Sequence, residues 1–159
     1  MKPRVYVETS VISYLVAWPS RDLVVAAHQQ ITRDWWSKRE HFELYASPLV
    51  VAEAARGDAQ AAQRRLALLQ EFAAVEMNAA VDKLGRQLVL QLALPPNALD
   101  DAFHVAAATV HGLDFLLTWN CAHIANLQTR RKIEAICREA GYEPCVIGTP
   151  EELAFDLEK

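Results

Sequence analysis

Four side chains with oxygen donors stand out, because each follows a strand-like segment or lies in the first turns of a helical one. They are Glu8, Glu53, Asp101 and Asn120. Hard divalent cations prefer oxygen ligands, and Mg²⁺ usually takes one or two carboxylates together with water and phosphate oxygens. Carboxylates gathered in one pocket repel each other unless a cation neutralises them. Such a cluster suits phosphodiester hydrolysis, in which a metal activates water and stabilises the phosphoryl charge.

The four positions differ in how strongly they indicate a site. Glu8 follows the apolar segment 5–7 directly, and this sharp change favours a site over an exposed strand-end carboxylate. Glu53 alone is ambiguous, since a helical glutamate is as often solvated surface as a ligand. Asp100 falls in the first turn of a predicted helix, where a carboxylate stabilises the helix dipole. We therefore assign Asp100 a structural role and Asp101 the pocket.

The sequence excludes several other kinds of site. Three cysteines without CxxC spacing argue against a disulfide framework or a zinc ribbon. The five glycines form neither GxGxxG nor a phosphate-binding loop, and there is no GxSxG nucleophile motif. His104 lies three residues after Asp101, where it would either touch phosphate or pack between helices. Trp119, beside Asn120, is a candidate for stacking on bases.

The net charge of −4 restricts the class of nucleic-acid partner. A module that binds nucleic acid by neutralising phosphates alone would usually be basic. A metal-dependent nuclease tolerates this charge, because its acidic residues are concentrated in the pocket and the cation supplies positive charge.

The elements that must position these residues alternate between short strands and helices. Strands are predicted at residues 4–7, 42–46, 74–77, 114–118 and 144–147. Helices are predicted at 21–40, from 47 onward, at 58–72, 79–94, 97–110 and 129–140, and from 149 onward. Ser47, Asn97 and Thr149 are the predicted N-caps of three of them. This alternation predicts an α/β fold with a mainly parallel sheet, whose ligands collect at the carboxyl ends of the strands. All four candidates would then meet at one edge.

The 159 residues contain no internal repeat, low-complexity tract or linker, so we expect one domain over 1–159. No stretch approaches the roughly 20 apolar residues that cross a bilayer. The N-terminal residues also lack the features of a signal peptide. We therefore expect a cytoplasmic protein with no membrane partner.

Taken in order, four segments resemble the PIN domain family, and within it the VapC-type toxins of bacterial toxin–antitoxin pairs. The segments are Tyr6–Ile12, Val50–Glu53, Asp101–Ala108 and Leu116–Asn120. The resemblance extends over nearly the whole chain, and its motifs follow the family's order.

This resemblance implies a Rossmann-like α/β/α sandwich, Mg²⁺ or Mn²⁺ dependence and endoribonuclease activity on RNA. It also implies an antitoxin protein as partner and a homodimer. The family's three acidic metal ligands correspond to Glu8, Glu53 and Asp101, and its last acidic position corresponds to Asn120. Its supporting hydroxyl residues correspond to Ser10 and Thr118.

Two positions depart from the family pattern, since Glu8 and Asn120 both stand where aspartate is common. The leading hypothesis is a metal-dependent ribonuclease toxin, in which metal-activated water hydrolyses RNA and Asn120 orients that water. The alternative is a PIN-like module that binds RNA or a protein partner without efficient cleavage.

Overall fold

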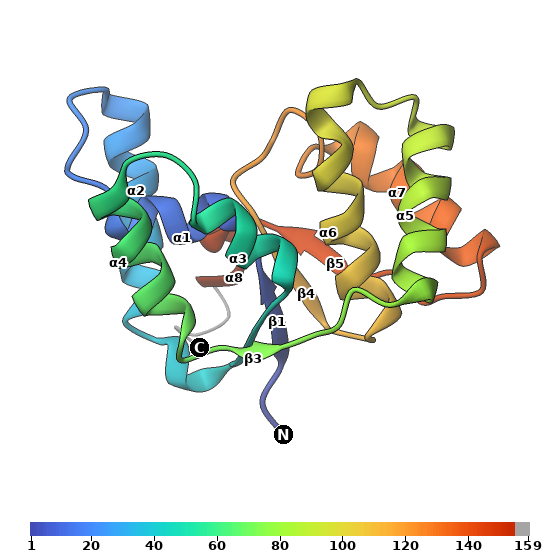
Figure 1. Cartoon of the computed structure of the whole chain (residues 1–159), viewed down its shortest axis with the longest axis horizontal. Coiled ribbons are helices and arrows are strands. Elements are labelled where there is room, and N and C mark those ends of the chain that lie inside the picture. The colour runs from blue at the N-terminus through green and yellow to red at the C-terminus, as the bar shows by residue number, and fades with distance from the viewer. Residues whose placement is uncertain (155–159) are drawn as a thin grey trace.

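The computed structural model describes residues 1–154, in which five short strands form one sheet (Figure 1). The strands are β1 Arg4–Val7, β2 Glu43–Ala46, β3 Ala73–Ala74, β4 Phe115–Leu117 and β5 Val146–Gly148. All neighbouring strands are parallel, in the order β3-β2-β1-β4-β5. The order changes direction between β1 and β4, and such a switch point is where open α/β sheets bind their ligands.

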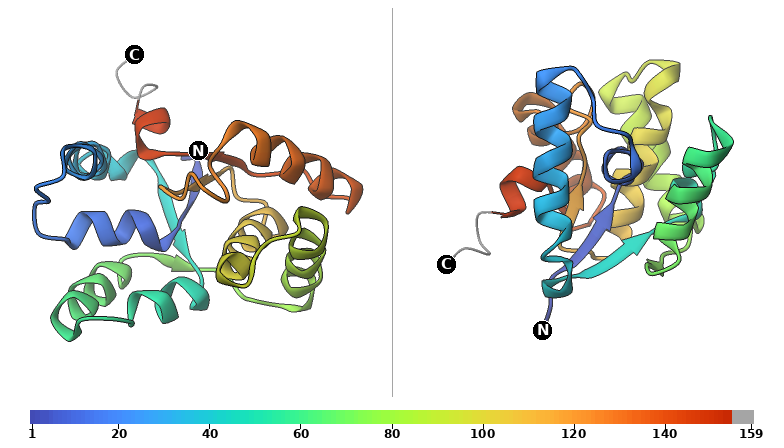
Figure 2. Two further views of the ribbon diagram at one scale, coloured as in Figure 1. Left: turned by 90° about the horizontal axis from the view of Figure 1, so that it is seen from above. Right: turned by 90° about the vertical axis from the view of Figure 1, so that its left-hand side faces the viewer.

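Helices cover both faces of the sheet (Figure 2). They are α1 Thr9–Val16, α2 Leu23–Trp36, α3 Pro48–Ala54, α4 Ala59–Leu69, α5 Ala79–Leu92, α6 Leu99–Val110, α7 Leu127–Glu139 and α8 Pro150–Ala154, with short 3₁₀ turns η1 Arg39–His41 and η2 Pro96–Ala98. The predicted α/β sandwich with a parallel sheet is confirmed. Residues 155–159 of the predicted domain lie outside the described residues. Within residues 1–154, no helix combines the length and apolarity needed to span a bilayer.

The central strand β1 and its neighbour β4 are buried on both faces, and their carboxyl ends lie side by side. Val5, Val7, Leu116 and Leu117 are at most 1 % exposed, as expected for strands covered by helices on both sides. In the register of β1 and β4, Val7 pairs with Leu117. The residues that follow, Glu8 and Thr118, are therefore neighbours at the carboxyl edge of the sheet.

Helices α5 and α6 approach closely at Gly85. A Cβ atom on this residue would lie 2.4 Å from the ring of Phe103, inside van der Waals contact. The absence of a side chain at Gly85 therefore lets the Phe103 ring pack directly on the α5 backbone. This packing fixes the helix that carries Asp101 at its start.

Two of the three predicted N-caps are confirmed and one is wrong. Ser47 caps α3, since its Oγ accepts from Val50 N at 3.3 Å, and Thr149 forms the predicted capping box with Glu152. The cap predicted at Asn97 is wrong. The residue lies inside η2, which begins at Pro96, and α6 starts afterwards without a side-chain cap.

Helix α1 was not predicted at all. It has only eight residues, includes β-branched Val11 and Ile12, and starts directly after β1. Its cap is the Glu8 side chain, which accepts a hydrogen bond from Ser10 N at 2.7 Å. Glutamate is not among the common N-cap residues, so the usual signal for a helix start was missing.

Candidate metal centre

Glu8 is only 6 % exposed, and hydrogen bonds fix both of its carboxylate oxygens. Ser10 Oγ and Thr118 Oγ1 donate to Oε1 at 2.7 and 2.6 Å, and Ser10 N donates to Oε2 at 2.7 Å. The two hydroxyl residues predicted to support the site thus both contact Glu8. These donors hold the carboxylate in one orientation at the start of α1.

Glu53 projects from α3 and is half-buried. Its Oε1 accepts from Thr9 Oγ1 at 2.7 Å and from His104 Nε2 at 2.5 Å. Burial alone would raise the pKa of Glu53. Three neighbours outweigh the effect of burial and hold this pKa below its usual range. They are His104, through its hydrogen bond and positive charge, Thr9, through its hydrogen bond, and Arg56, through its charge. Glu53 is therefore ionised.

His104 is fully buried at the centre of a hydrogen-bond chain. Its Nδ1 lies 2.7 Å from the Tyr6 hydroxyl, which lies 2.7 Å from Ser47 Oγ. Burial lowers the pKa of His104, but the hydrogen bond to Glu53 and the negative charges of the site raise it overall. Because Ser47 caps the helix that carries Glu53, the chain joins β1, α3 and α6 behind the acidic residues.

Asp101 lies in the first turn of α6 and is partly buried. Burial and the negative charge of Glu8 raise its pKa to about 6, against the opposing effect of a hydrogen bond with the Asn120 side chain and of nearby histidines. Asn120 Oδ1 accepts from His123 N at 3.2 Å, and its backbone N–H donates to Thr118 Oγ1 at 3.0 Å. The amide of Asn120 is therefore held beside Asp101.

One edge of the sheet, called the acidic edge below, carries all four predicted residues. Glu8 lies close to Glu53, and Asp101 lies beside Asn120. The ligand atoms of Glu8, Glu53 and His104 all lie within 4.8 Å of one another, and Asp101 is not part of this group. His104 has a hydrogen-bond partner at each ring nitrogen, so we treat it as the support of Glu53. The remaining donors are carboxylate oxygens, which suit Mg²⁺ or Mn²⁺ better than a soft transition metal.

Sequence reasoning missed the second layer of the site: Tyr6, Thr9 and Ser47 as hydrogen-bond partners. For His104 it left phosphate contact and helix packing open. Complete burial excludes phosphate contact and leaves the packing role. One signal was present, since a tyrosine between two valines in a buried strand needs a partner for its hydroxyl. Asp100 faces Arg56 at 3.9 Å, in agreement with a structural role.

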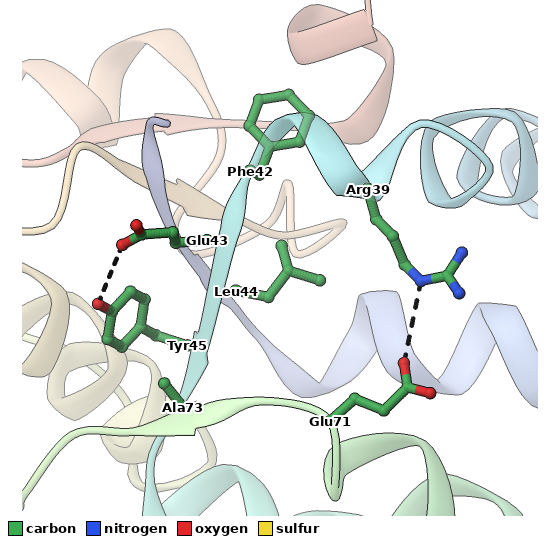
Figure 3. A pocket seen from close by; sticks show the side chains of 7 residues that line it. All are labelled: Arg39, Phe42, Glu43, Leu44, Tyr45, Glu71 and Ala73. Carbon is green, nitrogen blue, oxygen red and sulfur yellow. Dashed lines mark hydrogen bonds and ion pairs between the residues drawn. The ribbon is translucent and has the colours of Figure 1, made fainter. Parts of the chain in front are cut away.

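A cavity of about 380 Å³ opens at the edge of the sheet formed by β2 and β3 (Figure 3). It is lined by Arg39, Phe42, Glu43, Leu44, Tyr45, Glu71 and Ala73. Arg39 pairs with Glu71 at 3.9 Å, and Tyr45 donates weakly to Glu43 at 3.4 Å. None of these lining residues belongs to the acidic edge. We therefore do not assign the metal centre to this cavity, despite its size.

Comparison with known proteins supports the predicted resemblance. The PIN domain family matches residues 5–120 of the chain. The fold is similar to that of VapBC2 from Rickettsia felis bound to a DNA fragment from their promoter, with 12 % identity, 92 % of this chain and 98 % of that chain covered, and a TM-score of 0.58. The fold is also similar to that of DNA-bound VapBC from Salmonella typhimurium, with 12 % identity and a TM-score of 0.56. That match covers 93 % of this chain and 98 % of the other. No curated protein matches at a significant level.

Proposed function

Because the chain belongs to the PIN domain family, we propose that it is a metal-dependent endoribonuclease that hydrolyses RNA phosphodiesters. One observation carries the proposal most directly. The carboxylates of Glu8 and Glu53 have oxygens within 4.8 Å of each other, although the residues lie on different elements. Two carboxylate groups at this distance repel each other when both carry charge, so a cation between them would stabilise the site.

The donor set fits a hard cation, since Glu8, Glu53 and Asp101 offer carboxylate oxygens. When bound, Mg²⁺ or Mn²⁺ would neutralise charge on the phosphate and activate the attacking water. The chain's own residues would position these groups. Ser10 and Thr118 hold Glu8, while His104 and Thr9 hold Glu53.

Asn120 would position the attacking water through its amide. Its oxygen already accepts from His123 N at 3.2 Å, which defines the orientation of the amide. Asp101, with its pKa raised to about 6, is mostly ionised at neutral pH, and its carboxylate oxygens would be open to a cation.

The two similar structures described above are VapBC toxin–antitoxin complexes, and they support a more specific proposal. We propose that this chain is the toxin of such a pair, with an antitoxin protein as partner and a homodimer as its own assembly. Its site of action would be the cytoplasm, where its RNA substrate is found.

The alternative function is binding of RNA or a protein partner without efficient cleavage. Asn120 is the observation that favours it, since an amide in place of a carboxylate removes one negative charge from the cation site. Cation binding alone does not distinguish the ribonuclease from the binding module. Cleavage of RNA by the wild-type protein separates them.

The proposed cation site is tested by thermal unfolding with and without Mn²⁺. A ligand bound only by the folded state at 100 times its Kd stabilises that state by about 2.7 kcal/mol. Wild type should show a Tm increase of several degrees, and Glu8→Gln/Asp101→Asn should show none. Glu43→Gln/Glu71→Gln, from the cavity of Figure 3, is the matched control and should behave as wild type. An equal increase in wild type and Glu8→Gln/Asp101→Asn would place the cation elsewhere.

A further inference from the structure

A cavity of about 300 Å³ lies directly beside the acidic edge, between α1, α2 and the segment after β4. Two of its lining residues also hold the acidic side chains. Ser10 Oγ donates to Glu8 Oε1, and the backbone N–H of Asn120 donates to Thr118 Oγ1, which in turn donates to Glu8 Oε1. A group inside this cavity would therefore be separated from the carboxylates by the width of one side chain.

Aromatic rings form one wall of the cavity and are fixed in advance. Trp119 is 9 % exposed, donates from Nε1 to Thr32 Oγ1 at 2.8 Å and stacks on His28 with 4.1 Å between ring centroids. Tyr14 packs nearly perpendicular to both rings, at 6.1 Å from Trp119 and 6.2 Å from His28. Tyr14 is only half-buried. A planar ligand would meet a rigid aromatic wall, so little side-chain freedom would be lost on binding.

The rest of the lining is uncharged, which restricts the ligand. Both polar atoms of the Gln29 amide already have a partner, since Oε1 accepts from Ser20 N and Nε2 donates to Trp18 O. The Ser13 and Tyr14 hydroxyls have no hydrogen-bond partner within residues 1–154. With no cationic side chain in the lining, the cavity lacks what a phosphate group needs. A neutral, planar ring with hydrogen-bonding edges fits its walls.

We propose that this cavity is a nucleobase subsite, which takes one unpaired base of single-stranded RNA next to the phosphate at the acidic edge. The base stacks on Tyr14, and the Ser13 hydroxyl lies within the same cavity for hydrogen bonding to the base. A base in a duplex is paired and stacked, so the subsite selects single strands. The inference rests on the proposed function for its RNA substrate, but base binding does not require cleavage.

The test uses a pentaribonucleotide with a central 2-aminopurine, whose fluorescence falls when it stacks. Binding is measured in the Asp101→Asn background, where cleavage should be slowed by about 100-fold or more, with Mn²⁺ present. In this background Tyr14→Ala should weaken binding roughly 10-fold or more and abolish quenching, whereas Tyr14→Phe, which keeps the ring, should retain both. Tyr45→Ala, from the separate cavity of Figure 3, is the matched control. The melting temperature of each variant checks folding.

A pentaribonucleotide that lacks the central base should bind with equal affinity to Asp101→Asn, the parent variant, and to Tyr14→Ala made in that parent. The subsite is overturned if the parent does not bind the 2-aminopurine RNA, if Tyr14→Ala binds it as tightly as the parent, or if removing the base changes nothing. The cavity would then be left for a protein side chain. Cleavage by wild type is measured separately. If Tyr14→Ala cleaves RNA as fast as wild type does, the subsite is wrong and the ribonuclease stands. If wild type binds the base but does not cleave RNA, the ribonuclease is wrong and the subsite stands.

Discussion

His104 Nε2 lies 2.5 Å from Glu53 Oε1, a contact that joins α6 to α3 between residues 51 positions apart. Glu53 is half-buried on a seven-residue helix, where a glutamate side chain would otherwise sample many rotamers. The buried histidine restricts it to the orientation that faces Glu8. His104 is in turn held by the Tyr6 hydroxyl. The geometry of the acidic edge therefore depends on a residue that no solvent or substrate reaches.

Tyr6→Phe should expose this dependence. The change removes a buried hydroxyl and leaves Ser47 Oγ and His104 Nδ1 without this partner, which should lower the free energy of unfolding by about 1–3 kcal/mol. Mn²⁺ binding should weaken as well, because Glu53 loses its fixed support. Urea unfolding and metal titration measure both effects. Tyr45→Phe, whose hydroxyl is 3.4 Å from exposed Glu43, should change stability by less than about 0.5 kcal/mol. Equal effects of the two variants would refute the role of the chain.

The pKa of Asp101 predicts how stability varies with pH in metal-free protein. Burial and Glu8 raise this pKa from 3.8 to about 6, so between these values the folded state keeps a proton that the unfolded state has lost. The free energy of unfolding therefore falls as pH rises from about 4 to 6. Asp101→Asn removes this loss and should gain on wild type by on the order of 1–2 kcal/mol above pH 6, with no gain below pH 4. Urea unfolding with EDTA across this range measures it. A difference that is constant with pH would contradict the shift.

Asn120→Asp should change apo stability and metal binding in opposite directions. A second carboxylate beside Asp101 replaces a hydrogen-bonding amide, so the metal-free variant should melt below wild type. Affinity for Mn²⁺ should increase roughly tenfold, because a hard cation gains from an added charged oxygen ligand. Melting temperatures and calorimetry with Mn²⁺ provide the two readouts. If neither changes, residue 120 lies outside the cation site.

Gly85→Ala should destabilise the packing of α5 on α6. The new Cβ would meet the Phe103 ring at 2.4 Å, and overpacking of this kind costs about 1–3 kcal/mol. Gly148→Ala is the matched control, since its Cβ would meet its nearest atoms at an ordinary 3.6 Å. Thermal unfolding compares the two. Phe103→Leu should recover part of the loss in the Gly85→Ala background, and a neutral Gly85→Ala would show that the helices are not in close contact there.

Most of the fold could be predicted because its signals are local. The buried strands are short apolar runs, and Ser47 and Thr149 start helices through hydrogen bonds to residues three positions away. Helix α1 and the cap at Asn97 failed for local reasons as well. Glutamate is an uncommon cap for α1, and Pro96 favours a 3₁₀ turn where a helix cap was expected.

The acidic edge could be anticipated only in part. The carboxyl ends of parallel strands lie together, which is enough to bring Glu8 and Asn120 to the same edge. The hydrogen-bond partners of His104 lie 51 and 98 positions away, and no pattern in the sequence pairs them. The base-stacking role expected of Trp119 also depended on tertiary structure, since burial of Trp119 leaves Tyr14 as the more accessible ring.

Cleavage of a mixed panel of single-stranded RNAs with Mn²⁺ tests the central claim most directly. Wild type should cleave, EDTA should stop the reaction, and Asp101→Asn should reduce the rate by about 100-fold or more while its fold is retained. Glu43→Gln, far from the acidic edge, should cleave at the wild-type rate. Cleavage by Asp101→Asn at the wild-type rate would contradict the assigned site. A wild-type protein that binds Mn²⁺ and RNA but leaves every RNA intact would contradict the ribonuclease and establish the binding module in its place.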